Sequence, residues 1–228
     1  MEVRRTGRLR ALVQAAFFLL VVRPFMAMFI GLRVRGRQHL PPGDPFLLIA
    51  NHSSHLDTLA LLSLFPLRRL ACIRPVAAAD YFERTRTRAF VSRLLFNILP
   101  IDRQPLGRRA DPLSRMGEAL TAGDSLLLFP EGTRGRGDLV APFHHGVAAL
   151  LERLPDLVVH PAYLRNLGRS LPKGELLPVP FFCEVVLGPP VRPEGDRSAV
   201  AAALRDAVVA LAVEPSGTAG GPAKPSAV

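Results

Sequence analysis

The pattern of apolar residues at the start of the chain predicts a pair of short helices. Apolar side chains dominate residues 11–22 and again residues 25–32, and Arg23-Pro24 separates the two runs. Neither run reaches the roughly 18 apolar residues of a membrane span, and proline favours a break in a helix. We therefore expect two helices that lie in or dip into one leaflet of a membrane, with arginine side chains at the headgroups. A pair of buried core helices is the alternative.

From residue 46 onward, short apolar runs alternate with segments of helical periodicity. Strands are predicted at residues 46–50, 98–101, 125–129, 157–164 and 180–187. Helices are predicted at residues 57–64, 86–96, 111–122, 144–154 and 196–213. This alternation is typical of an α/β fold, with a mixed, largely parallel sheet flanked by helices.

The same pattern divides the chain into three parts. Residues 1–33 are predicted to form the membrane-anchoring helical segment, and residues 34–213 the α/β domain. Residues 214–228 are rich in Pro, Gly, Ser and Ala, a composition typical of a disordered tail.

The positive charge is concentrated in two stretches. The formal net charge is +10, while residues 1–38 alone carry +7 and residues 84–115 carry +6. A compositional bias toward arginine explains the number of arginines but not their clustering. Nucleic acid is a disfavoured partner, because the chain has no Trp and only two Tyr to serve as stacking platforms. We expect anionic membrane lipid instead, at the cytoplasmic face, where arginines near an apolar segment are enriched.

The two cysteines, Cys72 and Cys183, are isolated and far apart in the sequence. They have neither the spacing of a metal site nor that of a disulfide framework, which is consistent with a reducing compartment.

The first candidate for chemistry directly follows the strand predicted at residues 46–50. Residues 51–57 read Asn-His-Ser-Ser-His-Leu-Asp. His52 and Asp57 would lie about 140° apart on an ideal helix, but they can converge if the chain turns before a helix begins near Asp57. An aspartate that accepts from one imidazole nitrogen leaves the other nitrogen free to act as a general base. No Gly-x-Ser-x-Gly motif is present, so the histidine would activate a substrate hydroxyl directly.

Two other interpretations of this motif remain open. Asp57 or Ser54 could merely cap the following helix while His52 fills space. His52, His55 and Asp57 could also be metal ligands, although the sequence holds no further ligand cluster near them, so we expect no metal.

The second candidate follows the strand predicted at residues 125–129. Residues 129–134 read Phe-Pro-Glu-Gly-Thr-Arg. Gly132 permits a sharp turn and a close approach of the backbone to a ligand, and Arg134 offers a planar fork of donors to phosphate oxygens. Thr133 adds a hydroxyl. The segment predicts a phosphate-binding loop, and an ordinary surface turn is the alternative.

Together, the two motifs resemble those of the glycerolipid acyltransferases, specifically the lysophosphatidic acid acyltransferases. The resemblance covers about residues 34–190 and is specific because both motifs occur in the family's order and spacing. It implies that His52 is the catalytic base and Asp57 its orienting partner. It also implies that Arg103, Glu131, Gly132, Thr133 and Arg134 contact the phosphate of the acceptor.

Three positions depart from the family's pattern, and one segment has no assigned role. Asn97 stands where a glycine is common, His144-His145 lacks the usual lysine before Gly146, and His160 interrupts an apolar block. Residues 166–169 and 171–175 resemble features of one bacterial branch of the family, while an ordinary solvated loop is the alternative.

The resemblance implies transfer of a fatty acyl group from acyl-CoA or acyl carrier protein to 1-acyl-sn-glycerol 3-phosphate, which gives phosphatidic acid. The acyl thioester is a co-substrate, and no cofactor is expected. Backbone amides near Ser53 and Ser54 are candidates to stabilise the oxyanion. Other acceptors remain possible: glycerol 3-phosphate, another lysophospholipid or a lyso-aminolipid. A non-catalytic lipid-binding protein of the same fold is the alternative from another class.

Overall fold

The computed structural model describes residues 2–79, 85–102, 111–135, 139–171, 175 and 177–213. The tail predicted at residues 214–228 and Arg103 lie outside these described residues. The division into three parts therefore stays a prediction.

A seven-stranded sheet forms the centre of the described part of the chain. In spatial order its strands are β1 (Arg33–Arg35), β7 (Glu184–Leu187), β6 (Val159–Arg165), β2 (Leu47–Ala50), β5 (Ser125–Leu128), β3 (Ile73–Ala78) and β4 (Leu99–Ile101). Neighbouring strands are parallel except for β6 and β7, which are antiparallel. The predicted mixed, largely parallel sheet is confirmed.

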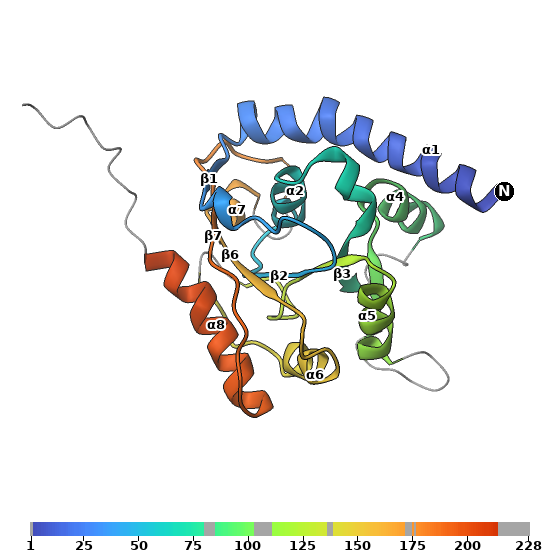
Figure 1. Cartoon of the computed structure of the whole chain (residues 1–228). Coiled ribbons are helices and arrows are strands. Elements are labelled where there is room, and N and C mark those ends of the chain that lie inside the picture. The colour runs from blue at the N-terminus through green and yellow to red at the C-terminus, as the bar shows by residue number, and fades with distance from the viewer. Residues whose placement is uncertain are drawn as a thin grey trace, which may run out of the picture.

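Helices cover both faces of the sheet (Figure 1). The N-terminal helix α1 (Glu2–Phe17), α2 (Leu56–Ser63) and α4 (Arg86–Phe96) lie on one face, and α5 (Pro112–Thr121), α6 (Gly146–Arg153) and α8 (Arg197–Val213) lie on the other. Three shorter helices, Arg37–His39, Leu67–Cys72 and α7 (Leu167–Ser170), connect these elements.

Strand β2, in the middle of the sheet, is apolar at every position. Leu48 and Ala50 pack into the core cluster beneath α1 and α2, whereas Leu47 and Ile49 pack into the cluster beneath α5, α6 and α8. Successive side chains of a strand point to opposite faces, so β2, which is covered on both faces, presents no side chain to water. The ends of β2 are thereby fixed in the middle of the molecule.

The N-terminal segment differs from the predicted pair of helices. The helix continues from α1 through two π-helical stretches, Phe18–Val22 and Phe25–Phe29, so Gly7–Phe29 forms one helix of 23 residues. By length and composition it could cross a membrane. Only 22% of its apolar window is buried, which argues against the alternative of buried core helices.

The expected break at Arg23-Pro24 is wrong because both residues keep helical backbone angles. Proline lacks the amide that an α-helix requires, and the π-helical stretches on either side shift the hydrogen bonds from i−4 to i−5. The guanidinium of Arg23 also turns inward, where Nη2 donates to the carbonyl of Phe65 at 2.6 Å. One donor of the guanidinium is therefore paired with the domain, and Arg23 does not interrupt the helix.

One departure from the family's pattern has a backbone explanation. Asn97, directly after α4, has a φ of +53° and is buried, and its Nδ2 donates to the carbonyl of Ala71 at 2.8 Å. Glycine adopts this left-handed conformation freely, and asparagine tolerates it better than most residues. The position therefore requires a positive φ, which asparagine supplies in this chain.

The other departure within the sheet, His160 on β6, is a buried imidazole. It lies edge-on to the ring of Phe46 at 6.1 Å, and burial lowers its pKa below the ordinary value, although a hydrogen bond to the backbone of His39 opposes this shift. The folded protein therefore binds a proton at this position more weakly than the unfolded chain does.

We expect His160 to make the fold less stable in mild acid. Because its pKa is lowered on folding, its contribution is present above the unfolded value near 6.5 and is lost as the pH falls below that value. Between about pH 7.5 and about pH 5.5, the wild type should therefore lose more unfolding free energy than His160→Gln. Denaturant unfolding of both proteins at both pH values measures this difference, and equal losses would contradict it.

Candidate active site

Both sequence motifs lie at the same edge of the sheet. Strand β2 ends at Ala50, directly before the first motif, and its parallel neighbour β5 ends at Leu128, directly before the second. The carboxyl ends of adjacent parallel strands meet at one edge, which is where α/β proteins bind their ligands. Residues 51–57 and 129–135 are therefore brought together although about 75 residues separate them.

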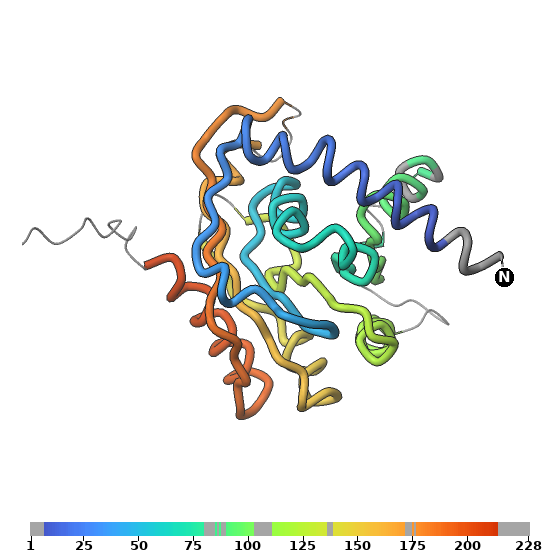
Figure 2. The backbone as a smooth tube through the Cα atoms, turned by 45° about the horizontal axis from the view of Figure 1, so that its top comes forward, coloured from blue at the N-terminus to red at the C-terminus, as the bar shows by residue number. Residues whose placement is uncertain are grey.

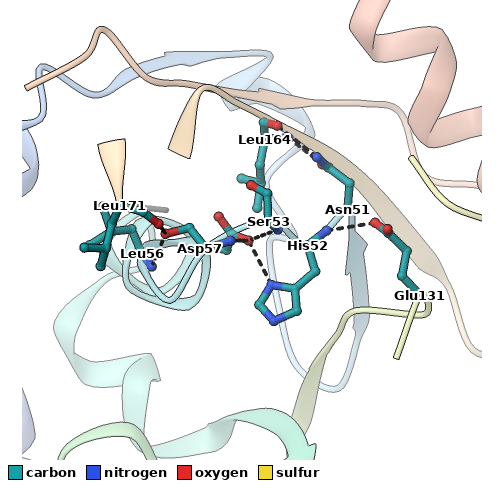
Figure 3. A network of polar contacts seen from close by, with 9 residues as sticks. Asn51, His52, Ser53, Leu56, Asp57, Glu131, Leu164 and Leu171 are labelled. Carbon is teal, nitrogen blue, oxygen red and sulfur yellow. Dashed lines mark hydrogen bonds and ion pairs between the residues drawn. The ribbon is translucent and has the colours of Figure 1, made fainter. Parts of the chain in front are cut away.

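The side chains of His52 and Asp57 are in contact. Nδ1 of His52 lies 2.8 Å from Oδ2 of Asp57, and the other ring nitrogen, Nε2, points away from this network (Figure 3). Asp57 is fully buried, while the side chain of His52 is 20% exposed. The predicted convergence of the two side chains is confirmed, and one nitrogen of a partly accessible imidazole remains for substrate.

The carboxylate of Asp57 also organises the loop that carries the histidine. Its Oδ2 accepts hydrogen bonds from the backbone amides of Ser53 at 2.6 Å and Ser54 at 2.8 Å. Both amides are thus directed at Asp57, which makes our expectation that they stabilise an oxyanion wrong. The helix-capping alternative holds only for Ser54, whose Oγ accepts from the amide of Leu56 at 3.2 Å.

The second motif holds His52 through both its backbone and its ring. The amide of His52 donates to Oε1 of Glu131 at 2.8 Å, and its carbonyl accepts from the amide of Gly135 at 2.8 Å. The ring of Phe129 stacks on the imidazole, with centroids 4.2 Å apart and an angle of 17° between the planes. The two motifs therefore form one site, in which residues 129–135 restrict the position of the histidine.

Glu131 occupies a different position from the one that the family resemblance implies. Its side chain is buried, and its second oxygen, Oε2, accepts from the amide of Ala141 at 3.2 Å. Burial raises the pKa of Glu131, and the hydrogen bonds from His52 and Ala141 oppose this shift. A buried carboxylate that already accepts two amide hydrogens is a poor phosphate contact, so the geometry favours a role in positioning His52.

The remaining residues of the second motif form an exposed turn. Gly132 has a φ of +69°, and a Cβ there would lie 2.8 Å from Cδ2 of His144, so the turn requires glycine both for its conformation and for the space. Thr133 is exposed and Arg134 is half-buried. His144 thus lies against the predicted phosphate loop, close to where the family's usual lysine is missing.

A third segment, from the end of β6 through α7, supports the histidine loop from behind. The side-chain amide of Asn51 forms two hydrogen bonds with the backbone of Leu164, and Oγ of Ser54 donates to the carbonyl of Leu171 at 3.0 Å. Gly168 packs so closely that a Cβ there would lie 2.9 Å from Cβ of Ser53. Sequence reasoning assigned no role to this segment. A glycine two residues after an asparagine at a strand end was the available signal.

Within the described residues, no three His, Cys, Asp or Glu side chains are grouped closely enough to hold a metal ion. His52 and Asp57 instead contact each other, and Arg103 cannot be placed because it lies outside the described range.

Comparison with known proteins finds one family and its relatives. The sequence model of the family described as Acyltransferase matches residues 31–165. The chain is 29% identical over 182 residues to 1-acyl-sn-glycerol-3-phosphate acyltransferase alpha of Mus musculus, and the alignment covers 78% of this chain and 61% of that protein. It thus spans about three fifths of the length of this relative. It is also 27% identical to a lyso-ornithine lipid O-acyltransferase of Brucella abortus, over 82% of this chain and 78% of that protein.

A solved structure supports the fold. The 1-acyl-sn-glycerophosphate (LPA) acyltransferase PlsC from Thermotoga maritima superimposes with a TM-score of 0.68, covering 92% of this chain and 83% of that one. The identity is 19%, so this likeness concerns the arrangement of helices and strands alone.

The two possible roles of Glu131 predict different kinetics for Glu131→Gln. The carboxamide accepts only through its oxygen, so one of the two amide contacts is lost and His52 shifts. We expect kcat for the predicted acyl transfer to fall about 10- to 100-fold with little change in KM for the acceptor. A phosphate contact would instead give a rise in KM at unchanged kcat. Steady-state kinetics with varied acceptor concentration decides between them.

Gly168→Ala is expected to displace the histidine loop without unfolding the protein. Its methyl group would meet Ser53, whose amide donates to Asp57, so kcat should fall by up to about 100-fold while circular dichroism stays unchanged. Replacing Ser53 by glycine removes the atoms that the new methyl meets, so the double variant Ser53→Gly/Gly168→Ala should recover part of the loss.

Two further glycines provide matched controls for this prediction. Gly117→Ala introduces a methyl group with no atom within 4 Å, and Gly188→Ala introduces one that lies 2.9 Å from Leu211 and 3.2 Å from Pro161, outside the histidine loop. Both should keep wild-type kcat. A Gly168→Ala protein as active as these controls would refute the positioning role.

Proposed function

The chain belongs to the acyltransferase family, and from this premise we propose that it transfers a fatty acyl group from an acyl thioester to the free hydroxyl of 1-acyl-sn-glycerol 3-phosphate, giving phosphatidic acid. One observation carries the proposal. The imidazole of His52 bonds to a buried aspartate through one nitrogen, and the loop that is predicted to bind phosphate holds the backbone of the same residue.

In the proposed reaction, Nε2 of His52 removes the proton of the acceptor hydroxyl as its oxygen attacks the thioester carbonyl. The contact between Nδ1 and Asp57 orients the ring and stabilises the imidazolium that forms. When the tetrahedral intermediate collapses, the carbon–sulfur bond breaks and the imidazolium donates its proton to the thiolate. A thiol has a pKa of about 8.5, far below that of an alcohol, so the thiolate is the better leaving group.

The acceptor phosphate is proposed to bind at the turn that contains Thr133 and Arg134. What supports this is its position: the turn leads into Gly135, whose amide donates to the carbonyl of His52. A phosphate at this turn would hold the acceptor hydroxyl near the imidazole. Arg103 belongs to the same proposal on the strength of the sequence alone.

The donor is proposed to be acyl-CoA or an acyl carrier protein, used as a co-substrate with no cofactor. We further propose that the enzyme is associated with the membrane at its cytoplasmic face. The exposed apolar helix Gly7–Phe29 and the lipid nature of the acceptor support membrane association, and the arginines near the helix support the cytoplasmic side.

A lyso-ornithine lipid is the second candidate acceptor. The observation in its favour is that the lyso-ornithine lipid acyltransferase of Brucella abortus aligns over 78% of its length, compared with 61% for the mouse enzyme. An ornithine lipid has no phosphate, so this acceptor would make no use of a phosphate contact at Arg134.

A panel of acceptors tests both the reaction and the substrate. The full-length protein is incubated with labelled acyl-CoA or acyl carrier protein and, in turn, with 1-acyl-sn-glycerol 3-phosphate, glycerol 3-phosphate, other lysophospholipids and lyso-ornithine lipid. We expect labelled phosphatidic acid as the main product, and a loss of about 10²- to 10⁴-fold in His52→Ala.

The control for this experiment is His39→Ala, a histidine outside both motifs, which should retain activity. If lyso-ornithine lipid is acylated faster than the other acceptors, the second candidate is the acceptor and the proposed one is wrong. A folded His52→Ala protein that turns over like the wild type would refute the catalytic role and favour the non-catalytic lipid-binding alternative.

A further inference from the structure

A second exposed apolar element lies close to the N-terminal helix. In the loop before β7, Leu177 is 83% exposed and Phe182 is 80% exposed, and Val179 and Phe181 are exposed as well. Four large apolar side chains within six residues are unusual on a water-facing surface, where such clusters mark sites of contact with proteins or membranes. The proposed reaction at the sheet edge uses none of them.

This loop is continuous with the exposed face of the helix. A Cβ placed on Gly31, just after the helix, would lie 3.3 Å from the ring of Phe182, and the amide of Arg33 donates to the carbonyl of Cys183 at 2.9 Å. On the helix side of this junction, Met28 and Phe29 are exposed. Figures 1 and 2 show the loop, in orange, beside the end of the blue helix in both views.

Hydrogen bonds to the segment behind the histidine loop hold this apolar loop in place. The amide of Val179 donates to the carbonyl of Ser170 at 2.7 Å, and Nδ2 of Asn166 donates to the carbonyl of Phe182 at 3.1 Å. Two backbone groups of the loop are thus paired within the protein, while its large apolar side chains are exposed. This combination suits insertion into lipid, where unpaired backbone groups would be costly.

We propose that residues 177–182 form a second bilayer-contacting element, which inserts into the same leaflet as the helix. The inference rests on the proposed function, because it takes the acceptor to be a membrane lipid. A bilayer is the occupant that fits the continuity with a helix long and apolar enough to cross one. The exposed side chains of Arg33 and Arg169 flank the two elements in the sequence and are suited to anionic headgroups.

The apolar loop is connected to the catalytic residues through Ser170 and Leu171. Ser170, which holds Val179, is followed by Leu171, whose carbonyl accepts from Oγ of Ser54 in the histidine loop. The loop and the catalytic residues are therefore attached to the same short segment. Two separate contacts with the bilayer restrict the tilt of the domain, whereas a single helix would leave the domain free to swing.

The chain has no tryptophan, so single introduced tryptophans report on each surface without background. Three full-length variants are compared: Phe182→Trp in the loop, Leu20→Trp on the exposed face of the helix, and Val213→Trp on α8 as the control. Val213 is 77% exposed and apolar, but it lies at the end of α8, on the opposite face of the sheet from the helix. Each is mixed with vesicles of phosphatidylglycerol and phosphatidylethanolamine, with and without brominated acyl chains.

We expect the emission of Phe182→Trp and Leu20→Trp to shift to shorter wavelength and to be quenched by the brominated chains, and that of Val213→Trp to remain unchanged. Quenching of Leu20→Trp alone would overturn the loop proposal while leaving the membrane helix intact. Quenching of neither would overturn membrane association itself. Short-wavelength emission of Phe182→Trp before lipid is added would identify a second copy of the chain as the occupant instead.

A second measurement uses loss of binding. Phe181→Ser/Phe182→Ser should weaken partitioning into the same vesicles by at least about tenfold, because two large apolar side chains no longer enter lipid. Val213→Ser, which removes an equally exposed apolar group elsewhere, should bind like the wild type. Equal binding by all three proteins would refute the contact.

Discussion

The site depends on one buried carboxylate. Asp57 has no exposed surface, and a charge in that position is tolerated only when hydrogen bonds replace the lost water. Oδ2 receives three, from the imidazole of His52 and from the amides of Ser53 and Ser54. The same contacts fold residues 52–54 into a tight loop at the start of α2, so the residue that orients the ring also determines the path of the chain that carries it.

The order of strands in the sheet brings further residues into contact with this loop. Strand β2 lies between β5 and β6, so the segments that follow all three strands meet around His52. From β5 come the stacking ring of Phe129 and the carboxylate of Glu131. From β6 comes the segment on which Asn51 and Ser54 rest. The parallel order of these strands is therefore the reason why motifs that are distant in the sequence converge.

Local patterns predicted much of the molecule, and long-range contacts explain the rest. Helix α4 has the predicted bounds, and the turn expected between His52 and Asp57 brings their side chains into contact. Strand β3 escaped prediction because Pro75 and Arg74 interrupt its apolar run, although pairing with β4 and β5 still extends it. The oxyanion assignment failed because the direction of the Ser53 and Ser54 amides is set by a side chain that the motif alone cannot orient. Gly168 had no visible role because its neighbour Ser53 is 115 positions away.

The N-terminal helix packs against the domain through a regular stripe of buried residues. Its fully buried positions recur at every fourth residue: Gln14, Phe18, Val22, Met26 and Ile30. The π-helical turns stretch the repeat so that this stripe runs nearly parallel to the axis, where an ordinary α-helix would let it drift sideways. Deletion of one residue would rotate the part of the helix before it by about 100°. Exposed side chains would then replace the buried ones in the contact with the domain. The docking of the helix therefore depends on the number of residues between these positions.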